Sequence, residues 1–324
     1  MVAALAGVSR STVSRVVNSS PKVTPEVIEA VNSAISTLGY VPNRAARILA
    51  SRKTDSIALV IPENTAKFFA DPYFASVIQG VATYLSKTEY TLTLLIASET
   101  DPLKTRKYLT GGNVDGALVL SHHSDDHSYV ELGKTIPMVF GGRPMSKGGP
   151  SHVVDVDNVA AAATAVQYLI DRGKKSIATI AGPQDMAAGL DRLEGWRRTV
   201  TAAGLRADLF EAADFTPAGG AVAMQRILDT KVPFDGLFAA SAQMASGALG
   251  VLREYGIDVP GQIGVTTIDN DYYAKNANPP LTTVDQPSVQ QGAKMAEVLV
   301  RIIAGEDVEM LTIMPTHLIE RASV

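Results

Sequence analysis

Hydrophobic and polar positions in the first forty residues alternate with the period of short helices. Val13, Val16 and Val17 recur at the spacing of a buried helical stripe, while Arg10 and Ser11 fall outside that stripe. The pattern predicts a helix that begins near Arg10, packs its valines inward and presents a polar, basic face.

Glycine and capping residues predict where this helix begins. Gly7 can adopt a positive φ without steric cost, and Ser9 is a favourable N-cap that can accept from the backbone N–H of Ser11 or Thr12. Residues 2–5 can form barely one turn before it. The predicted order is a short helix, a tight glycine turn and a second helix.

Another helix is predicted with Thr24 at the N-cap position, Pro25 at the first helical position and Gly39 at the C-terminal end. Its apolar residues are Ile28, Val31, Ile35 and Leu38. Three helices in this order are typical of a helix-turn-helix module, whose second helix enters the DNA major groove. A small helical cap with a polar face is the alternative that the helix pattern leaves open.

From about residue 56 onward, short runs of β-branched and other apolar residues alternate with helical stretches. This alternation is typical of βαβ units with mainly parallel sheets. The predicted strands are 57–61, 91–96, 116–120, 137–140, 176–181, 236–240 and 263–268.

Parts of these segments recur further along the chain. The sequence SIA at 56–58 recurs at 176–178, and DGALVLS at 115–121 recurs as DGLFAAS at 235–241. A duplicated α/β domain is the simplest explanation. Two such open sheets, joined face to face, leave a cleft at the carboxyl ends of their strands, where ligands of α/β proteins usually bind.

The composition restricts the class of protein. The chain has 324 residues, of which 46% are hydrophobic and 19% charged, and it has no cysteine. It is therefore a globular chain with two or three folding units and without disulfides or thiolate chemistry. The N-terminus has no apolar signal segment, and no run approaches about 18 apolar residues. We therefore expect neither export nor a membrane span, and we expect a cytoplasmic location.

The sequence lacks the phosphate-loop, dinucleotide-binding and nucleophile-elbow motifs of common enzyme classes. No enzyme activity or cofactor is predicted.

The charge is divided unevenly along the chain. Residues 1–55 hold seven Lys and Arg against three acids, a charge of +4. Since the whole chain carries −4, the remainder carries −8. A basic N-terminal part on an acidic body is expected when only the N-terminal part meets DNA phosphates.

The segments GVSRSTVSRVVN (7–18) and VTPEVIEAVNSAISTLGYVPNRAARILAS (23–51) closely resemble the DNA-binding headpiece of the lactose-repressor (LacI/GalR) family of transcription factors. The resemblance extends over nearly all of the chain. It implies a ligand-controlled repressor that binds double-stranded operator DNA as a homodimer. Family members carry several residues before the matching Val2, so the first helix is expected to be truncated.

The resemblance also implies the division into domains. Residues 1–42 are expected to form an all-α helix-turn-helix headpiece, residues 43–55 a hinge helix and linker, and residues 56–324 the effector-binding and dimerisation core. The core is expected to contain two Rossmann-like parallel-sheet subdomains, as in periplasmic binding proteins, with three chain crossings between them. The first subdomain then comprises about 56–155 plus 286–315, and the second about 156–285 plus 316–324.

The resemblance assigns DNA contacts residue by residue. Arg10, Ser11 and Arg15 are expected to read base edges in the major groove. The residues expected to contact phosphates are Ser9, Thr12, Ser14, Asn18, Lys22, Asn43 and Arg44. Ala46 and Leu49 are assigned to the hinge helix, with Leu49 wedged into a minor-groove step that kinks the duplex.

The expected effector is a small polyhydroxylated molecule, a mono- or disaccharide, bound between the subdomains. In the resemblance, Arg192 and Asp269 clamp adjacent ligand hydroxyls, because guanidinium and carboxylate groups each make two directed hydrogen bonds. Phe74 or Phe215 is expected against the apolar face of the sugar. The other residues expected in the cleft are Asp71, Tyr73, Ser121, His122 and Ser241.

One departure from the family concerns the second wall of the cleft. Ser241 and Ala242 stand where the family usually has Asn-Asp, which predicts a less polar wall. The alternatives are a nucleobase corepressor, a solute-binding protein of the same core fold, and a sugar-modifying enzyme with Asp269 and Asp271 as acid and base. The cluster HHSDDH (122–127) is the one metal-like motif, but its adjacent histidines project in divergent directions and no metal site is predicted.

Overall fold

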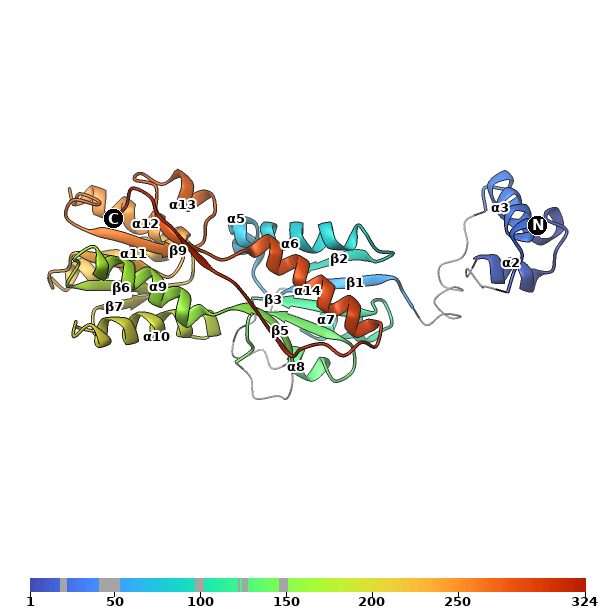
Figure 1. Cartoon of the computed structure of the whole chain (residues 1–324), viewed down its shortest axis with the longest axis horizontal. Helices are drawn as coiled ribbons and strands as arrows, with labels where there is room; N and C mark the ends of the chain where they lie inside the picture. Colours follow the sequence, from blue (N-terminus) through green and yellow to red (C-terminus); the bar gives the residue numbers. More distant parts are fainter. Residues whose placement is uncertain (18–21, 41–52, 97–101, 122, 124–127, 146–150) are drawn as a thin grey trace. The chain divides into compact units, whose positions relative to one another are not determined.

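The computed structural model describes residues 1–17, 22–40, 53–96, 102–121, 123, 128–145 and 151–324. The chain forms two compact units, Met1–Thr54 and Asp55–Val324 (Figure 1). None of the described helices is both long enough and apolar enough to span a bilayer.

The N-terminal unit contains the helices α1 (Val2–Leu5), α2 (Arg10–Val17) and α3 (Pro25–Thr37). The predicted cap of α2 is confirmed, because Oγ of Ser9 accepts from the backbone N–H of Thr12 at 3.0 Å. Gly7 takes the expected left-handed turn with a φ of +65°. The small core consists of the buried side chains Val2, Val16, Val31 and Ala34.

The apolar residues of α3 are not all buried. Ile28 is 37% exposed, and Val27 packs against the small core instead. Two short helices cover only a narrow stripe of α3, so an apolar residue one position off that stripe faces solvent.

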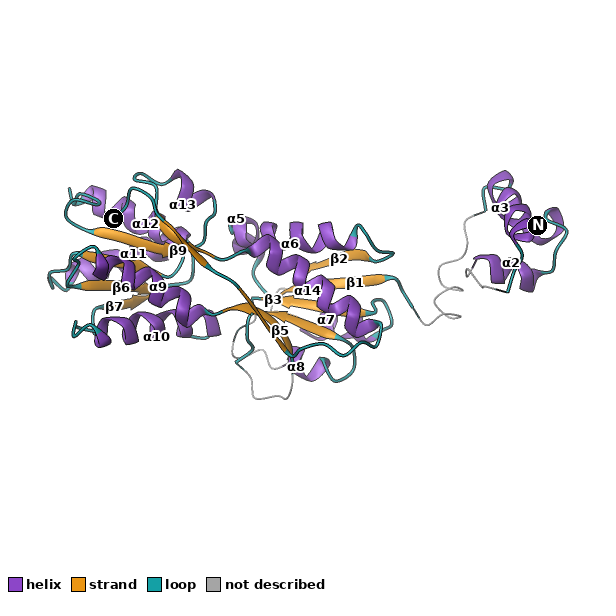
Figure 2. Ribbon diagram, in the orientation of Figure 1, coloured by secondary structure: helices purple, strands orange, loops and turns teal. Residues whose placement is uncertain are grey.

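The larger unit is built on two six-stranded sheets, each flanked by helices (Figure 2), which confirms the predicted fold class. The first sheet has the strand order β11-β5-β4-β3-β1-β2 and is parallel throughout. Its strands are β1 (Ser56–Ile61), β2 (Thr91–Ile96), β3 (Gly116–Leu120), β4 (Met138–Gly141), β5 (His152–Val156) and β11 (Leu311–Met314). Its helices are α5 (Thr65–Ala70), α6 (Pro72–Leu85), α7 (Pro102–Thr110), α8 (Ser128–Leu132) and α14 (Ser288–Ile303).

The second sheet has the order β12-β10-β9-β8-β6-β7, in which only β12 runs antiparallel to its neighbour. Its strands are β6 (Ile177–Ala181), β7 (Phe210–Ala212), β8 (Gly236–Ala239), β9 (Gly264–Ile268), β10 (Thr282–Asp285) and β12 (His317–Ile319). Its helices are α9 (Asn158–Asp171), α10 (Ala187–Ala202), α11 (Pro217–Asp229), α12 (Ala242–Glu254) and α13 (Tyr272–Asn276).

The sequence repeat corresponds to a structural repeat. In one sheet β1 lies between β3 and β2, and in the other β6 lies between β8 and β7. The aspartates that precede β3 and β8 make equivalent hydrogen bonds to the backbone just before β1 and β6. Asp115 accepts from the backbone N–H of Asp55 at 2.9 Å, and Asp235 accepts from those of Lys175 and Ser176 at 2.9 and 2.8 Å.

The chain passes between the two sheets three times. It does so between β5 and α9, between β10 and α14, and between β11 and β12. As a result α14, late in the sequence, packs against α6 of the first sheet (Figure 1). Glycine permits this close packing, because a Cβ on Gly80 would lie 1.9 Å from the carbonyl oxygen of Val289.

Candidate functional site

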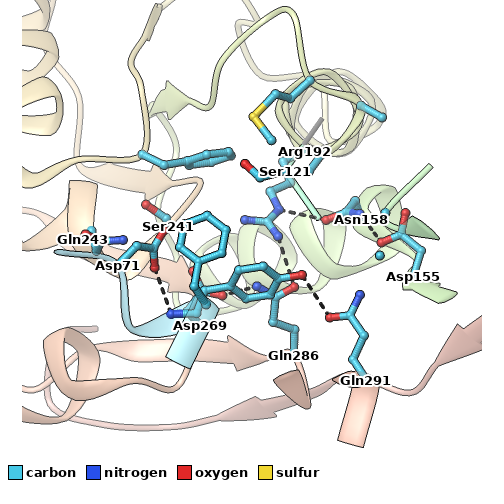
Figure 3. A pocket seen from close by; sticks show the side chains of 18 of the residues that line it. Asp71, Ser121, Asp155, Asn158, Arg192, Ser241, Gln243, Asp269, Gln286 and Gln291 are labelled. Atoms are coloured by element: carbon cyan, nitrogen blue, oxygen red, sulfur yellow. Dashed lines mark hydrogen bonds between the residues drawn. The ribbon is translucent and has the colours of Figure 1, made fainter. Parts of the chain in front are cut away.

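A cavity of about 810 Å³, counted with the open solvent at its mouth, lies between the two sheets at the carboxyl ends of their strands (Figure 3). Ser121 follows β3 and Ser241 follows the equivalent strand β8, and both line the cavity. Asp269, directly after β9, lines it as well. This is the position at which open α/β sheets commonly bind ligands.

The structure brings most of the predicted cleft residues together. Those that line the cavity are Asp71, Tyr73, Phe74, Ser121, Arg192, Phe215, Ser241 and Asp269. His122 lies outside the described residues. Sequence reasoning missed several further lining residues, among them Arg143, Asp155, Asn158, Gln243, Gln286 and Gln291.

Arg192 is held in place on three sides. Its Nε donates to Oδ1 of Asn158 at 2.9 Å, and Nη1 donates to the carbonyl oxygen of Ala240 at 2.7 Å. Its Nη2 lies 3.4 Å from Oε1 of Gln286 (Figure 3). The side chain is only 5% exposed, so it is a preorganised donor rather than a mobile surface charge.

Asp269 is joined to the same network. The amide of Gln286 donates to the Asp269 carboxylate, so one glutamine contacts both predicted clamp residues. Burial raises the pKa of Asp269, against the opposing effects of Arg192 and of the Gln286 hydrogen bond.

Backbone strain concentrates at this cavity. Ser121, Phe215 and Asp269 all line it, and they have φ values of +53°, +65° and +85°. Such left-handed conformations are costly for residues other than glycine and cluster at functional sites. Gly182 accommodates the Phe215 ring, since a Cβ there would lie 2.4 Å from Cζ of Phe215.

The two predicted aromatic platforms differ in accessibility. Phe74 is only 2% exposed and packs with Phe68 at a ring distance of 5.5 Å, as part of the core of the first sheet. Phe215 is partly exposed, and the Arg192 guanidinium lies 5.6 Å from its ring centroid. The accessible ring faces therefore come from Phe215 and Tyr73 rather than from Phe74.

Two further carboxyl groups at the cavity, Asp71 and Asp155, are desolvated as Asp269 is. Burial raises the pKa of Asp71 to about 7, although the backbone N–H of Tyr73 and the Gln243 amide oppose the shift. Burial also raises the pKa of Asp155, which accepts from the backbone N–H groups of Arg143 and Val156. Burial therefore makes ionisation of these carboxyl groups less favourable than it is in water.

The second wall is more polar than the Ser241-Ala242 departure predicts. Ser241 caps α12 by accepting from the backbone N–H of Met244 at 3.3 Å. Gln243, 5% exposed, supplies an amide to the cavity from the first turn of α12. The only signal for it in the sequence is its place directly after a strand end and an N-cap.

Of the metal-like cluster 122–127, the structure describes only His123. Residues 122 and 124–127 lie outside the described residues, and His123 bridges Oε1 of Glu63 at 3.2 Å and Oδ2 of Asp185 at 2.7 Å. In the part of the chain that is described, no three His, Cys, Asp or Glu side chains are grouped to hold a metal ion.

Comparison with known proteins identifies the relatives of this chain. Residues 2–43 match the model of bacterial regulatory proteins of the lacI family, and residues 166–324 match a periplasmic binding protein-like domain. The HTH-type transcriptional regulator CelR of Thermobifida fusca is 45% identical over 100% of this chain and 97% of its own length. The chain belongs to the LacI family of bacterial regulatory proteins.

Solved LacI-family structures share the whole architecture. A complex of the transcriptional regulator CelR with cellobiose has a TM-score of 0.81 and 43% identity, covering 100% of this chain and 98% of that one. A lac repressor dimer bound to operator has a TM-score of 0.86 at 24% identity, covering 99% and 97%, which shows the shared fold. This LacI-family chain is therefore a DNA-binding transcriptional regulator and not an enzyme.

Five of the residues predicted to contact DNA lie on α2 of the LacI-type headpiece, namely Arg10, Ser11, Thr12, Ser14 and Arg15. Arg10, Ser11 and Arg15 are exposed, whereas Val16 of the same helix is buried. The hydroxyl of Ser9 also lies 2.8 Å from those of Ser11 and Thr12. Ser14 and Lys22 are exposed as well. Asn18, Asn43, Arg44, Ala46 and Leu49 lie outside the described residues.

Proposed function

We propose that this regulator is a repressor whose affinity for its operator is controlled by a neutral sugar bound between the two sheets. The observation that carries this proposal is the joint position of Arg192, Asp269 and Phe215 at one cavity. A sugar presents vicinal hydroxyls and apolar ring faces, which such polar groups and an aromatic ring can bind together.

A disaccharide such as cellobiose is the ligand that we propose. The cavity is lined by polar groups from both sheets, as a ligand with hydroxyl groups along its length requires. The relative with 43% identity over the whole chain is a cellobiose complex, which supports a ligand of the same class here.

For DNA, we propose that Arg10, Ser11 and Arg15 contact bases while Ser9, Thr12, Ser14 and Lys22 contact phosphates. Asn18, Asn43 and Arg44 are further proposed phosphate contacts, and Ala46 and Leu49 are proposed to enter the minor groove from a hinge helix. We also propose a homodimer, because two headpieces are needed to read a two-fold operator. Its place of action is the cytoplasm, where the bacterial chromosome lies.

The ligand response is coupled to DNA binding through the crossings. Asn158 and Gln286, both bonded to Arg192, lie at two of the places where the chain passes between the sheets. Closure of the sheets on a ligand changes the angle at these crossings, and such coupling is typically worth about 1–3 kcal/mol.

The proposal is tested in two steps with the full chain. A preferred DNA fragment is first selected from a random library, and calorimetry with cellobiose then measures ligand affinity. Fluorescence anisotropy of the selected fragment, with and without cellobiose, measures the coupling. Specific DNA binding that shifts with cellobiose supports the proposal, and DNA binding that no neutral sugar shifts contradicts it.

A nucleobase corepressor is the second candidate. The Arg192 guanidinium and the Phe215 ring lie side by side, and such a pair can stack on and pair with a purine. Adenine and guanine in the same titration decide between the candidates, since only one class of ligand should bind and shift the DNA affinity.

A further inference from the structure

Two cations besides Arg192 line the cavity, and each is already engaged in an ion pair. Nζ of Lys67 donates to Oε1 of Glu63 at 2.8 Å. Nη2 of Arg143 lies 2.8 Å from both carboxylate oxygens of Asp191, which stands on α10 on the opposite side of the cavity. These are the two side chains best suited by type to bind an additional phosphate group.

Glu63 is a buried carboxylate within a group of charges that balance. It is 4% exposed and accepts from Lys67, Ser121 and His123. Burial opposes its ionisation, yet the hydrogen bonds from His123, Lys67 and Ser121 lower its pKa. The hydrogen bond to Glu63 in turn raises the pKa of His123 to about 9, and His123 also pairs with Asp185 at 2.7 Å. At neutral pH the positive charges of Lys67 and His123 thus offset the negative charges of Glu63 and Asp185.

The rest of the cavity disfavours an anion. Arg192 is surrounded by neutral acceptors and lies beside Asp269. Asp71 and Asp155 are desolvated carboxyl groups whose pKa values are already raised by burial. An incoming phosphate would meet these acids, while the nearby cations are occupied.

We propose that Glu63 and Asp191 make the cavity selective for uncharged sugars over phosphorylated sugars, because they keep Lys67 and Arg143 in ion pairs. This inference rests on the proposed function, since it concerns which sugars the same cavity accepts. Glu63 and Asp191 determine specificity without contacting the ligand. Removing either carboxylate leaves a cation at the cavity wall that is available to a phosphate.

The test compares cellobiose with cellobiose phosphate as ligands of the full chain by calorimetry. The wild type is expected to bind the phosphate ester at least about a hundredfold more weakly. Glu63→Gln should reduce this ratio at least about tenfold, and Asp191→Asn should reduce it by less, because the Arg143–Asp191 pair is more exposed. The ratio of the two affinities is the readout, because Arg143 and Asp191 also join the two sides of the cavity. Loss of this connection is expected to weaken the binding of both ligands equally, which by itself leaves the ratio unchanged. Adding Lys67→Met to Glu63→Gln should restore the wild-type ratio.

Glu131→Gln is the matched control, because Glu131 forms a well-exposed ion pair with Lys134 away from the cavity. Its ratio should equal that of the wild type. Equal wild-type affinity for both ligands, or an unchanged ratio in both folded variants, overturns the inference and leaves the proposed function standing. Failure of every neutral sugar to bind overturns the proposed function, and the inference falls with it.

Discussion

Asn158 accepts a hydrogen bond of 2.9 Å from Nε of Arg192, which ties the buried guanidinium of the ligand cavity to the first residue of α9. Asn158 in turn donates to Oδ1 of Asp155 at 3.2 Å, on the other side of the crossing. A ligand that moves Arg192 therefore acts directly on the segment that joins the two sheets. This chain of hydrogen bonds is a physical basis for coupling between the cavity and the crossing.

Replacing the guanidinium should separate ligand response from DNA binding. We expect Arg192→Ala to abolish the effect of cellobiose on DNA affinity while leaving DNA affinity itself within about threefold, because the headpiece is a separate folding unit. Anisotropy titrations with the selected DNA fragment measure both quantities. A mutant that still responds at the wild-type cellobiose concentration would contradict the role of Arg192.

The contact between α6 and α14 should tolerate no added methyl group. At Gly80 a Cβ would lie 1.9 Å from the carbonyl oxygen of Val289, so Gly80→Ala should lower the free energy of unfolding by about 1–3 kcal/mol or more. Chemical denaturation monitored by circular dichroism measures the change. Gly250→Ala is the matched control within α12, because a Cβ at Gly250 meets no atom within 4 Å. It should stabilise the protein by about 0.5–1 kcal/mol, and equal effects of the two substitutions would refute the packing argument.

His123 should make stability depend on pH in the alkaline range. The hydrogen bond to Glu63 raises its pKa from 6.5 to about 9. Because the folded-state pKa is the higher one, this stabilisation is fully present below pH 6.5 and is lost as pH rises through about 9. Denaturation curves recorded at several pH values give the free energy of unfolding at each pH. Between pH 6.5 and about 9 this free energy should decrease less steeply with pH for His123→Gln than for the wild type. The same substitution at His152 is the control, and an identical slope in all three proteins would exclude His123 as the cause.

Arg10 and Lys22 should affect DNA binding in different ways. Arg10→Ala is expected to relax preference at one or two base pairs, by about 1–3 kcal/mol each, because base-edge contacts carry sequence information. Lys22→Ala should weaken binding to all sequences alike and reduce its salt dependence, as expected for a phosphate contact. Binding selections from a random DNA library measure both. A uniform loss on all sequences for Arg10→Ala would remove Arg10 from the base-reading set.

Local signals in the sequence were sufficient for the headpiece and for the central strands. Gly7, Ser9 and Pro25 act through their own backbone conformation or through neighbours within one turn, so their effect is present before any tertiary contact forms. The central strands β1, β3, β6 and β8 are buried along their whole length, and their continuous apolar runs record this burial.

The edge strands β7 and β11 could not be predicted in the same way, although the edge strand β2 was. β7 has three residues and β11 alternates exposed and half-buried positions, so neither carries a continuous apolar run. Each is a strand because a neighbouring strand supplies hydrogen-bond partners, β6 for β7 and β5 for β11. In sequence the partners of β11 lie more than a hundred residues away, which no local pattern records.

Some residues of the ligand cavity could be predicted from the sequence, and others could not. Phe215 and Asp269 follow from a motif resemblance and from their places just after β7 and β9, whereas Arg192, within α10, follows from the resemblance alone. Asn158, Gln243 and Gln286 carry no sequence signal of their own, because an isolated amide has no typical spacing. Their role arises only when three chain crossings place them against Arg192, Asp71 and Asp269, and hydrogen bonding in a desolvated site then fixes those side chains.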